Sequence, residues 1–544
     1  MLTEPDKLWR RGPGLGLFTA LFLTVVLQAI MVARSPVIAK DGMSFIRIAA
    51  ELRADWIGAM HVEDQHPGYP AMVLAGYSLT RWLPGMSDFE AWILGGRLAA
   101  GLAGVVSVVM IWLLTRRIFD RRVADVAALM AAVWPLLRQN ASDVLSDTPH
   151  MMFYLAGVWL TCEGLARSSV RWFAAACVAS GMAYWVRPEG LIVGLTAGVL
   201  LLAQLWRYEG QSLTRSLVKV AAVGAVLLAI AAPYGILAGK FTSKKNPFQH
   251  EPTALEIAAA DIEPTEGLLS EPLPGAKLPD EFTRPASRLG AFAVGCCELG
   301  KEVGQGFYYL LLIPLGAWVF APTRLRADVA ASRMTTVLIF CHMGMLVLLF
   351  MTAGYVSHRH VMPLIGMMLP ATAAGTIWLS ERLAAYVPPL HPPRRALTAV
   401  MLVILLGLLP KSVRPLHGVY SSLVEAACWI KEHGHPGDSV LATSGYVRFY
   451  SEMQGLLLGP EAPNLPIGLV LAPESRPWSY IVLEVDERTF DRAQLCNPEA
   501  GYEQVLAIPA HPRRTWSKVL VFSRRATHDE RVAVRETEAA DKAQ

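Results

Sequence analysis

The chain alternates between long apolar runs and short polar segments. A membrane-spanning helix needs about 20 consecutive apolar residues, and eleven runs approach or reach that length. They lie at about residues 13–33, 91–114, 123–137, 149–166, 172–187, 189–206, 217–238, 304–320, 334–354, 361–381 and 396–410. The pattern predicts an all-α polytopic membrane protein with about 11 transmembrane helices, of which the third, fifth and eleventh are short.

Every second apolar run is followed by basic residues. They are Arg116, Arg117, Arg121, Arg122, Arg167, Arg171, Arg207, Arg215, Lys219, Arg324, Arg326, Arg333, Arg382, Arg394 and Arg395. Short loops rich in Lys and Arg lie on the cytoplasmic side of a membrane. We therefore expect a cytoplasmic N-terminus, outer loops at 34–90 and 239–303, and a C-terminus outside.

The first apolar run has a basic flank, Lys7, Arg10 and Arg11, which is also a feature of signal peptides. No convincing small-residue cleavage site stands before Lys40. We interpret the run as an uncleaved signal-anchor helix, with a cleaved signal peptide as the alternative.

The last part of the chain loses this apolar character. An amphipathic stretch at 419–433 is followed by short β-like runs at 439–441, 479–485, 505–508 and 518–522. We expect a transmembrane domain at 1–410, a small α/β domain on the outer side at 411–526, and a disordered charged tail at 527–544. A Cys428–Cys496 disulfide is compatible with an oxidising compartment, but spacing alone leaves the pairing open.

Charge content agrees with the membrane interpretation. Only 17% of the residues are charged and the net charge is +4, whereas soluble proteins carry about a quarter charged residues. The basic residues are dispersed between apolar runs instead of forming one stripe, so we expect no nucleic-acid partner.

Several carboxylates lie in the predicted outer segments. Asp41 follows the first span and precedes an amphipathic stretch, and Asp64 lies just before a His66-Pro67-Gly68-Tyr69-Pro70 box. Asp143 and Asp147 precede the fourth span. A carboxylate near lipid usually faces a polar cavity or a partner. The alternatives are a solvated loop residue for Asp41 and a helix cap for Ser146 or Asp147.

Cationic side chains occur on the same predicted side. Arg187 and Glu189 lie in a short turn between two spans, and His358, Arg359 and His360 precede the tenth span. An arginine guanidinium suits a phosphate through its planar fork of donors. The alternatives are a structural ion pair for Arg187 and Glu189, and lipid-headgroup contact for the His-Arg-His sequence. Carboxylates and cations beside apolar helices indicate chemistry on a lipid-linked phosphate.

In these features the chain resembles the GT-C class of integral membrane glycosyltransferases. It is most similar to the branch that contains dolichyl-phosphate-mannose–protein mannosyltransferases and bacterial aminoarabinose transferases. The resemblance covers about residues 10–410. It rests on Asp41, the His66–Pro70 box, Leu145-Ser146-Asp147-Thr148-Pro149, Arg187-Pro188-Glu189-Gly190, and Arg359 before Pro363.

The resemblance implies a bacterial inner-membrane enzyme that transfers a sugar, with inversion, from a polyprenyl-phosphate donor to a lipid, glycan or protein acceptor. Asp41 would be the general base, and Asp147 would position the acceptor or base or hold a divalent metal cation. Donor phosphate would lie against Arg359, Arg187, His66 and His358. The residues that shape the acceptor side would be Asp64, Tyr69, Asp143 and Glu189. Relatives differ in metal use, so metal dependence is left open.

Two positions depart from the family pattern. Protein mannosyltransferases often carry a second acid after the first-loop aspartate, where this chain has Gly42. In the aminoarabinose branch an acid and a Lys precede the proline of the box, where this chain has Gln65 and His66. The sugar and acceptor therefore stay open. A transporter or flippase of a lipid-linked saccharide, and a non-catalytic membrane scaffold, are the alternatives.

Overall fold

The computed structural model describes residues 14–62, 65–208, 211–239, 288–320, 328–435, 437–457, 478–485, 502–511 and 518–524. The chain divides into two compact units, one of residues 1–32 and 45–414 and the other of residues 33–44 and 415–544. We describe each unit by itself. One helix, α3, runs from Lys40 to Ala54 and contributes residues to both.

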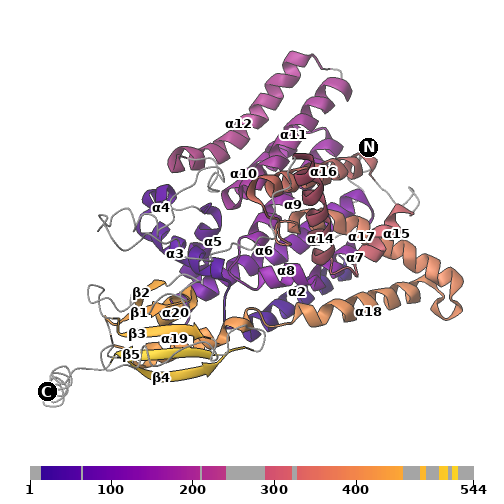
Figure 1. The fold of residues 1–544 in the computed structure, drawn as a ribbon. Coiled ribbons are helices and arrows are strands. Elements are labelled where there is room, and N and C mark those ends of the chain that lie inside the picture. The colour runs from indigo at the N-terminus through magenta and orange to yellow at the C-terminus, as the bar shows by residue number, and fades with distance from the viewer. Residues whose placement is uncertain are drawn as a thin grey trace. The chain divides into compact units, whose positions relative to one another are not determined.

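The first unit is helical throughout its described residues (Figure 1). Its helices vary widely in length. The bounds are α2 Leu15–Arg34, α4 Trp56–Val62, α5 Gly68–Thr80, α6 Asp88–Ile118, α7 Arg121–Val133, α8 Pro135–Ala141, α9 Asp147–Arg167, α10 Val170–Val186, α11 Leu191–Ala203, α12 Leu213–Ala238, α14 Arg288–Gly306, α15 Leu312–Val319, α16 Val329–Ala353, α17 Met362–Tyr386 and α18 Pro393–Ser412.

Seven described helical segments are long and apolar enough to cross a membrane. They are Leu15–Arg34, Asp88–Ile118, Pro188–Trp206, Leu213–Ala238, Val329–Thr352, Met362–Tyr386 and Pro393–Ser412. The prediction of a helical protein with several membrane-spanning segments is thus confirmed. The count of eleven crossings and their sidedness stay predictions.

Two predicted spans differ in detail from the structure. The run at 123–137 is divided between α7 and α8, because Pro135 lacks the N–H that would continue the helix from Trp134. The run at 304–320 is divided between α14 and α15, and Tyr308 and Tyr309 between them adopt positive φ angles of 52° and 56°. Part of the predicted outer loop at 239–303 is helical, because α14 begins at Arg288.

Close packing of α5 on α6 fixes the helix that begins within the His66–Pro70 box. A Cβ atom on Gly76 would lie 2.2 Å from the carbonyl oxygen of Gly95, so only glycine allows this approach. Beside it, the ring of Tyr77 stacks on Trp92 at 3.7 Å. A capping box between Ser87 and Glu90 begins α6. These contacts place Tyr69, near the start of α5, against α6.

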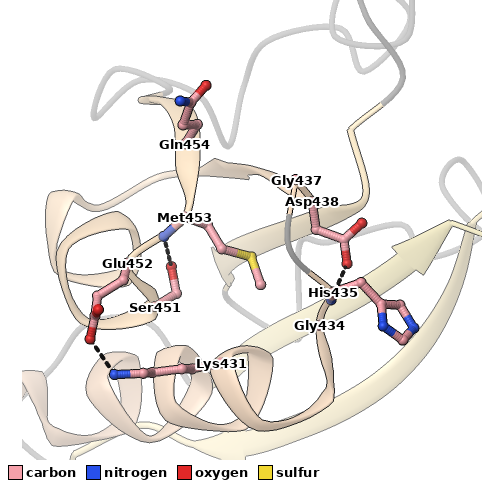
Figure 2. Close-up of a pocket in the computed structure, with 9 residues that line it drawn as sticks. All are labelled: Lys431, Gly434, His435, Gly437, Asp438, Ser451, Glu452, Met453 and Gln454. Carbon is pink, nitrogen blue, oxygen red and sulfur yellow. Dashed lines mark hydrogen bonds and ion pairs between the residues drawn. The ribbon is translucent and has the colours of Figure 1, made fainter. Parts of the chain in front are cut away.

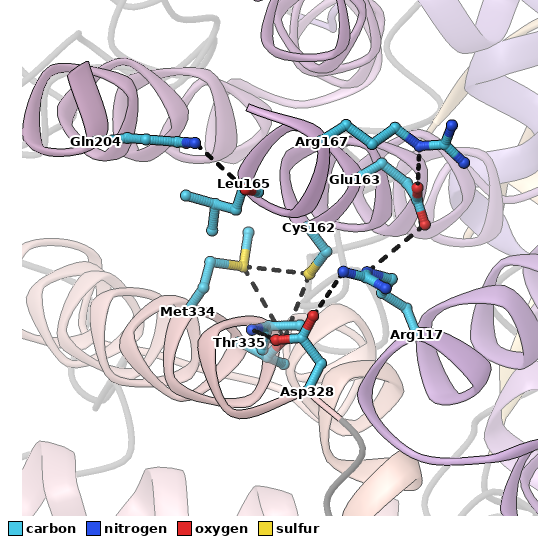
Figure 3. Close-up of polar contacts among 10 residues, drawn as sticks. Arg117, Cys162, Glu163, Leu165, Arg167, Gln204, Asp328, Met334 and Thr335 are labelled. Carbon is cyan, nitrogen blue, oxygen red and sulfur yellow. Dashed lines mark hydrogen bonds and ion pairs between the residues drawn. The ribbon is translucent and has the colours of Figure 1, made fainter. Parts of the chain in front are cut away.

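A group of charged residues joins α6, α9 and the start of α16 (Figure 3). Arg117 lies 2.5 Å from Asp328 and 3.7 Å from Glu163, and Arg167 lies 2.8 Å from Glu163. Asp328 also caps α16 by accepting from the amide of Ala331 at 2.8 Å. We call Arg117, Glu163, Arg167 and Asp328 the Glu163 cluster. The two positive charges of its arginines are balanced by the two negative charges of its carboxylates.

The second unit is an α/β structure with a five-stranded sheet of order β2-β1-β3-β5-β4. The strands are β1 Ser439–Ala442, β2 Gln454–Leu457, β3 Tyr480–Val485, β4 Tyr502–Pro509 and β5 Lys518–Arg524, and the helices are α19 Ser421–His433 and α20 Gly445–Ser451. The first three strands in the sheet are parallel, and β3-β5-β4 are antiparallel. The predicted α/β character is confirmed, while β2 and α20 were not predicted.

The segment 33–44 is part of the second unit. Two hydrogen bonds connect it to the rest of that unit. The amide of Leu416 donates to Ser35 Oγ at 2.9 Å, and the amide of Ile38 donates to the hydroxyl of Tyr450 at 2.9 Å. Cys428 is an exposed free thiol. Its predicted partner Cys496, and the tail at 527–544, lie outside the described residues.

Candidate active site

Asp147 is the centre of a buried ion-pair group in the first unit. Its side chain is 1% exposed, and its Oδ1 lies 2.7 Å from Nη2 of Arg187. Its Oδ2 accepts from Nε of Arg359 at 2.9 Å and from Nη2 of Arg359 at 2.7 Å. We call these three residues the Asp147 cluster. The structure thus brings together three residues that the sequence analysis selected from three separate segments.

Local structure explains how each member reaches the cluster. Asp147 is the first residue of α9, and no side chain caps this helix start, so the capping interpretation of Ser146 and Asp147 is wrong. Arg187 has extended backbone just after α10, and its Nε lies 3.3 Å from Ser146 Oγ. Arg359 lies in the short connection between α16 and α17. Three chain connections therefore converge on one carboxylate.

The charges of the cluster do not balance. Burial disfavours the ionised form of Asp147, but Arg187 and Arg359 outweigh that effect and lower the pKa of the carboxyl below its usual value. One carboxylate then faces two guanidinium groups, which leaves one net positive charge. The arginine side chains are 19% and 26% exposed, so both retain surface that an anion can contact.

Tyr69 links the loop before α9 to α5 and α6. It is fully buried, its hydroxyl donates to the carbonyl oxygen of Gly96 at 3.1 Å, and it also lies against the backbone of Leu145. Burial, followed by the charges of Asp143 and Asp147, raises the pKa of this hydroxyl. Tyr69 therefore stays protonated and holds the loop in place.

Asp143 is also buried, at 1% exposure, and its Oδ1 accepts from the amide of Val144 at 2.7 Å. The connection from 142 to 146, between α8 and α9, is not helical. Asp143 thus shapes the connection, and Asp147 carries the ion pairs.

His150 is a buried neighbour that the sequence analysis missed. It follows Asp147 by three residues on α9 and is 3% exposed, and its charged or titratable neighbours include Glu189, Arg187 and Asp147. A second buried histidine, His342, lies 3.0 Å from the hydroxyl of Tyr154 one turn further along α9. The spacing of residues 147, 150 and 154 on one helical face was the signal that could have identified this group.

The other predicted residues lie in different contacts. His66 is buried between the rings of Tyr184 and Tyr234, with centroid distances of 5.2 and 4.5 Å. His358 is half-exposed, and its Nδ1 lies 3.7 Å from the carboxylate of Glu302 on α14. Glu189 lies in the single turn Pro188–Gly190 beside Arg187.

Asp41 belongs to the second unit, where it is exposed in the first turn of α3. Asp64 lies outside the described residues. Both oxygens of Asp147 lie against arginine, and no group of three His, Cys, Asp or Glu residues in the described part of the chain is arranged to hold a metal ion. A role of Asp147 as a metal ligand therefore stays a prediction without a described ligand set.

The second unit contains a polar surface pocket of about 490 Å³ near the starts of β1 and β2 (Figure 2). Lys431 pairs with Glu452 at its rim, and the amide of His435 donates to Asp438 at 2.8 Å. None of the residues selected from the sequence lines it.

The helical architecture of the first unit and the small C-terminal sheet define the fold of the GT-C class of membrane glycosyltransferases, which confirms the resemblance noted from the sequence. A model of the dolichyl-phosphate-mannose-protein mannosyltransferase family matches residues 86–236. This match covers α6 to α12 and includes Asp147 and Arg187.

Two solved structures are similar over nearly the whole chain. They are both of ArnT from Cupriavidus metallidurans, one bound to undecaprenyl phosphate and one in the apo state. Each is 15% identical and covers 93% of this chain and 97% of the ArnT chain, with TM-scores of 0.56 and 0.54.

A third similar structure is the oligosaccharyltransferase of Archaeoglobus fulgidus in complex with Zn and sulfate. It is 13% identical, has a TM-score of 0.51, and covers 92% of this chain and 72% of the archaeal one. A comparison with curated protein sequences found no match.

Proposed function

We propose that this protein is an inverting glycosyltransferase, which moves a sugar from a polyprenyl-phosphate donor to an acceptor on the non-cytoplasmic face of a bacterial inner membrane. The observation that carries the proposal is the Asp147 cluster. Two partly exposed arginines share one buried carboxylate and present a net positive charge. Such a group suits a phosphate held at the end of an apolar tail.

The related structures support the donor class. One ArnT structure contains undecaprenyl phosphate, and the present chain has the same fold with apolar helices around a cationic group. In our proposal the lipid tail lies against the apolar helices, and the phosphate contacts Arg359 and Arg187.

The reaction would be a single displacement. An acceptor hydroxyl oxygen forms a bond to the anomeric carbon of the sugar, while the bond from that carbon to the phosphate oxygen breaks. The electron pair of the broken bond leaves with the polyprenyl phosphate, and attack from the opposite face inverts the configuration. Asp41 would take the proton of the acceptor hydroxyl as general base.

Each member of the Asp147 cluster has a part in this scheme. Arg359 and Arg187 would stabilise the negative charge that accumulates on the leaving phosphate. Asp147 would act as a positioning residue, because its two oxygens fix the orientation of both guanidinium groups. Glu189, Asp143, Tyr69 and Asp64 would shape the acceptor side. His66 would support the donor side, and His358 would do so only weakly, because it contacts Glu302.

The proposal includes the organisation of the chain. We propose eleven crossings, a cytoplasmic N-terminus, a transmembrane domain at 1–410 and an outer α/β domain at 411–526. The alternation of basic and acidic connections supports this topology.

The general-base assignment is tested by sugar transfer in membranes. We expect purified wild type to transfer label from at least one radiolabelled polyprenyl-phosphate sugar, and Asp41→Asn to lose transfer while it remains folded. Glu51→Gln is the matched control, because Glu51 is an exposed carboxylate further along α3, paired with Arg47. Full activity of Asp41→Asn would contradict the assignment.

A further inference from the structure

Arg138 is a fully buried guanidinium group outside the Asp147 cluster. It lies in the middle of α8 with 0% exposure. Its Nη1 donates one long hydrogen bond, 3.4 Å, to the carbonyl oxygen of Thr24 on α2. Its Nε and Nη2 are buried without a hydrogen-bond partner among the described residues.

The charge of Arg138 is not neutralised by a carboxylate of the described chain, since no ion pair involves it. Burying an unpaired ion costs several kcal/mol even after relaxation of the surroundings. Arg117, Arg187 and Arg359, in contrast, each pair with a carboxylate. Water can satisfy the N–H groups of Arg138, but it cannot balance the charge.

Three hydroxyl groups on α2, just after α8 and at the start of α9 are buried in the same way. They belong to Thr24 on α2, Ser142 one turn after Arg138, and Thr148 at the start of α9, and none has a described hydrogen-bond partner through its side chain. The three elements meet at α6. A Cβ atom on Gly104 would lie 2.6 Å from both Gln28 Nε2 and the Cβ of Ala141, and 3.6 Å from Thr148 Cγ2.

We propose that Arg138 binds a small monovalent inorganic anion, such as chloride, at this junction of α2, α6, α8 and α9. The site offers one formal positive charge together with hydroxyl donors, so one monovalent anion neutralises it. A phosphate dianion would exceed that charge. Full burial of the side chains also favours a small ion over a lipid headgroup.

The Arg138 site differs from the Asp147 cluster in its exposure and in its lack of a carboxylate partner. The Asp147 arginines are partly exposed and share a carboxylate, whereas Arg138 is enclosed and has none. An anion at Arg138 would therefore act as a resident structural ion that holds α2, α8 and α9 together, and it would not exchange with the donor phosphate.

The test uses the full chain in nanodiscs of phosphatidylcholine, which carry no net lipid charge. Retention of radiolabelled chloride and the midpoint of thermal unfolding are measured in chloride and in gluconate at equal ionic strength. The proteins are wild type, Arg138→Met, Thr24→Val and, as a matched control, Arg395→Met. Arg395 is an exposed arginine on α18 whose Nη1 donates to the carbonyl oxygen of His391.

We expect wild type and Arg395→Met to retain chloride and to unfold about 2–5 °C higher in chloride than in gluconate. Arg138→Met should lose both effects, and Thr24→Val should need several-fold more chloride for the same rise. If Arg138→Met does not fold, wild type and Thr24→Val still decide the question. Absence of retained chloride in wild type, equal retention by Arg138→Met, or equal unfolding midpoints of wild type in chloride and in gluconate would overturn the proposal.

Discussion

The two ends of α9 carry buried carboxylates with opposite charge balance. Asp147 at the start of the helix pairs with two arginines, Arg187 and Arg359. Glu163, 16 positions later and about 24 Å along the helix axis, also has two arginine partners, but Asp328 pairs with one of them (Figure 3). The Glu163 cluster is neutral, whereas the Asp147 cluster retains one positive charge.

This difference separates a structural ion-pair group from a candidate ligand site on one helix. In the Glu163 cluster every charge has a partner in the protein, so it holds α6, α9 and α16 together and offers nothing to a ligand. In the Asp147 cluster one cation is in excess and faces partly exposed surface. We therefore expect changes at the two ends to affect different properties.

The largest expected effect is the loss of activity in Asp147→Asn. The neutral amide cannot orient two guanidinium groups, so we expect kcat for sugar transfer to fall about 100-fold or more, with a smaller change in KM. Steady-state kinetics over a range of donor concentrations measures the two parameters. An equal rise in KM at unchanged kcat would show that the cluster only binds the donor.

The matched change at the other end is Glu163→Gln. Breaking a buried ion pair costs roughly 3–5 kcal/mol, so we expect a large fall in the free energy of unfolding. The folded fraction should keep nearly wild-type kcat. Denaturant unfolding and transfer assays on the same samples check both statements, and a catalytic loss like that of Asp147→Asn would remove the contrast between the two ends.

A smaller difference should separate the two arginines of the Asp147 cluster. Arg359 directs Nε and Nη2 to one carboxylate oxygen, while Arg187 has one nitrogen on Asp147 and one near Ser146. Lysine cannot reproduce a two-nitrogen contact. We expect Arg359→Lys to lower kcat/KM about 10–100-fold and Arg187→Lys to lower it less. The opposite ranking would place the main phosphate contact at Arg187.

The pH dependence of stability should distinguish the Asp147 carboxylate. Because its pKa is lower in the folded state, its contribution is fully present above the unfolded value, about 4, and is lost as pH falls through the folded value. The stability difference between wild type and Asp147→Asn should therefore be constant at neutral pH and shrink below about pH 4. A difference that grows on acidification would contradict the assigned direction.

The smallest effect is expected for His358→Gln. His358 is half-exposed and contacts Glu302 outside the Asp147 cluster, so we expect transfer activity to change less than about twofold, within the range of surface changes. A loss comparable to that of Arg359→Lys would show that His358 approaches the phosphate in the working enzyme.

Apolar periodicity predicted most of the architecture. The runs at 91–114, 149–166 and 361–381 correspond to α6, α9 and α17, and the short β-like runs correspond to four of the five strands. Apolar periodicity gives no information about contacts between segments that are far apart in the sequence. Asp147 and Arg359 are 212 positions apart, and only the shared outer-side placement of their loops suggested that they could meet.

The same limit explains why the sequence did not predict the contact of His358 or the burial of Arg138. Nothing local separates Arg359, which reaches Asp147, from the adjacent His358, which reaches Glu302, because helix packing decides the direction of each side chain. Likewise, Arg138 directly follows the predicted span at 123–137, and no local pattern signals that it is buried. Its complete burial depends on α2 packing over α8.

The most direct test of the central claim measures consumption of a polyprenyl-phosphate sugar by wild type and Arg359→Ala in membranes. A panel of radiolabelled donors would be used, with release of polyprenyl phosphate and labelled product both followed. We predict that wild type releases polyprenyl phosphate from at least one donor and that Arg359→Ala does so at least about 100-fold more slowly. Equal rates for both proteins, or transbilayer movement of intact labelled lipid without any release, would contradict the account and favour a transporter.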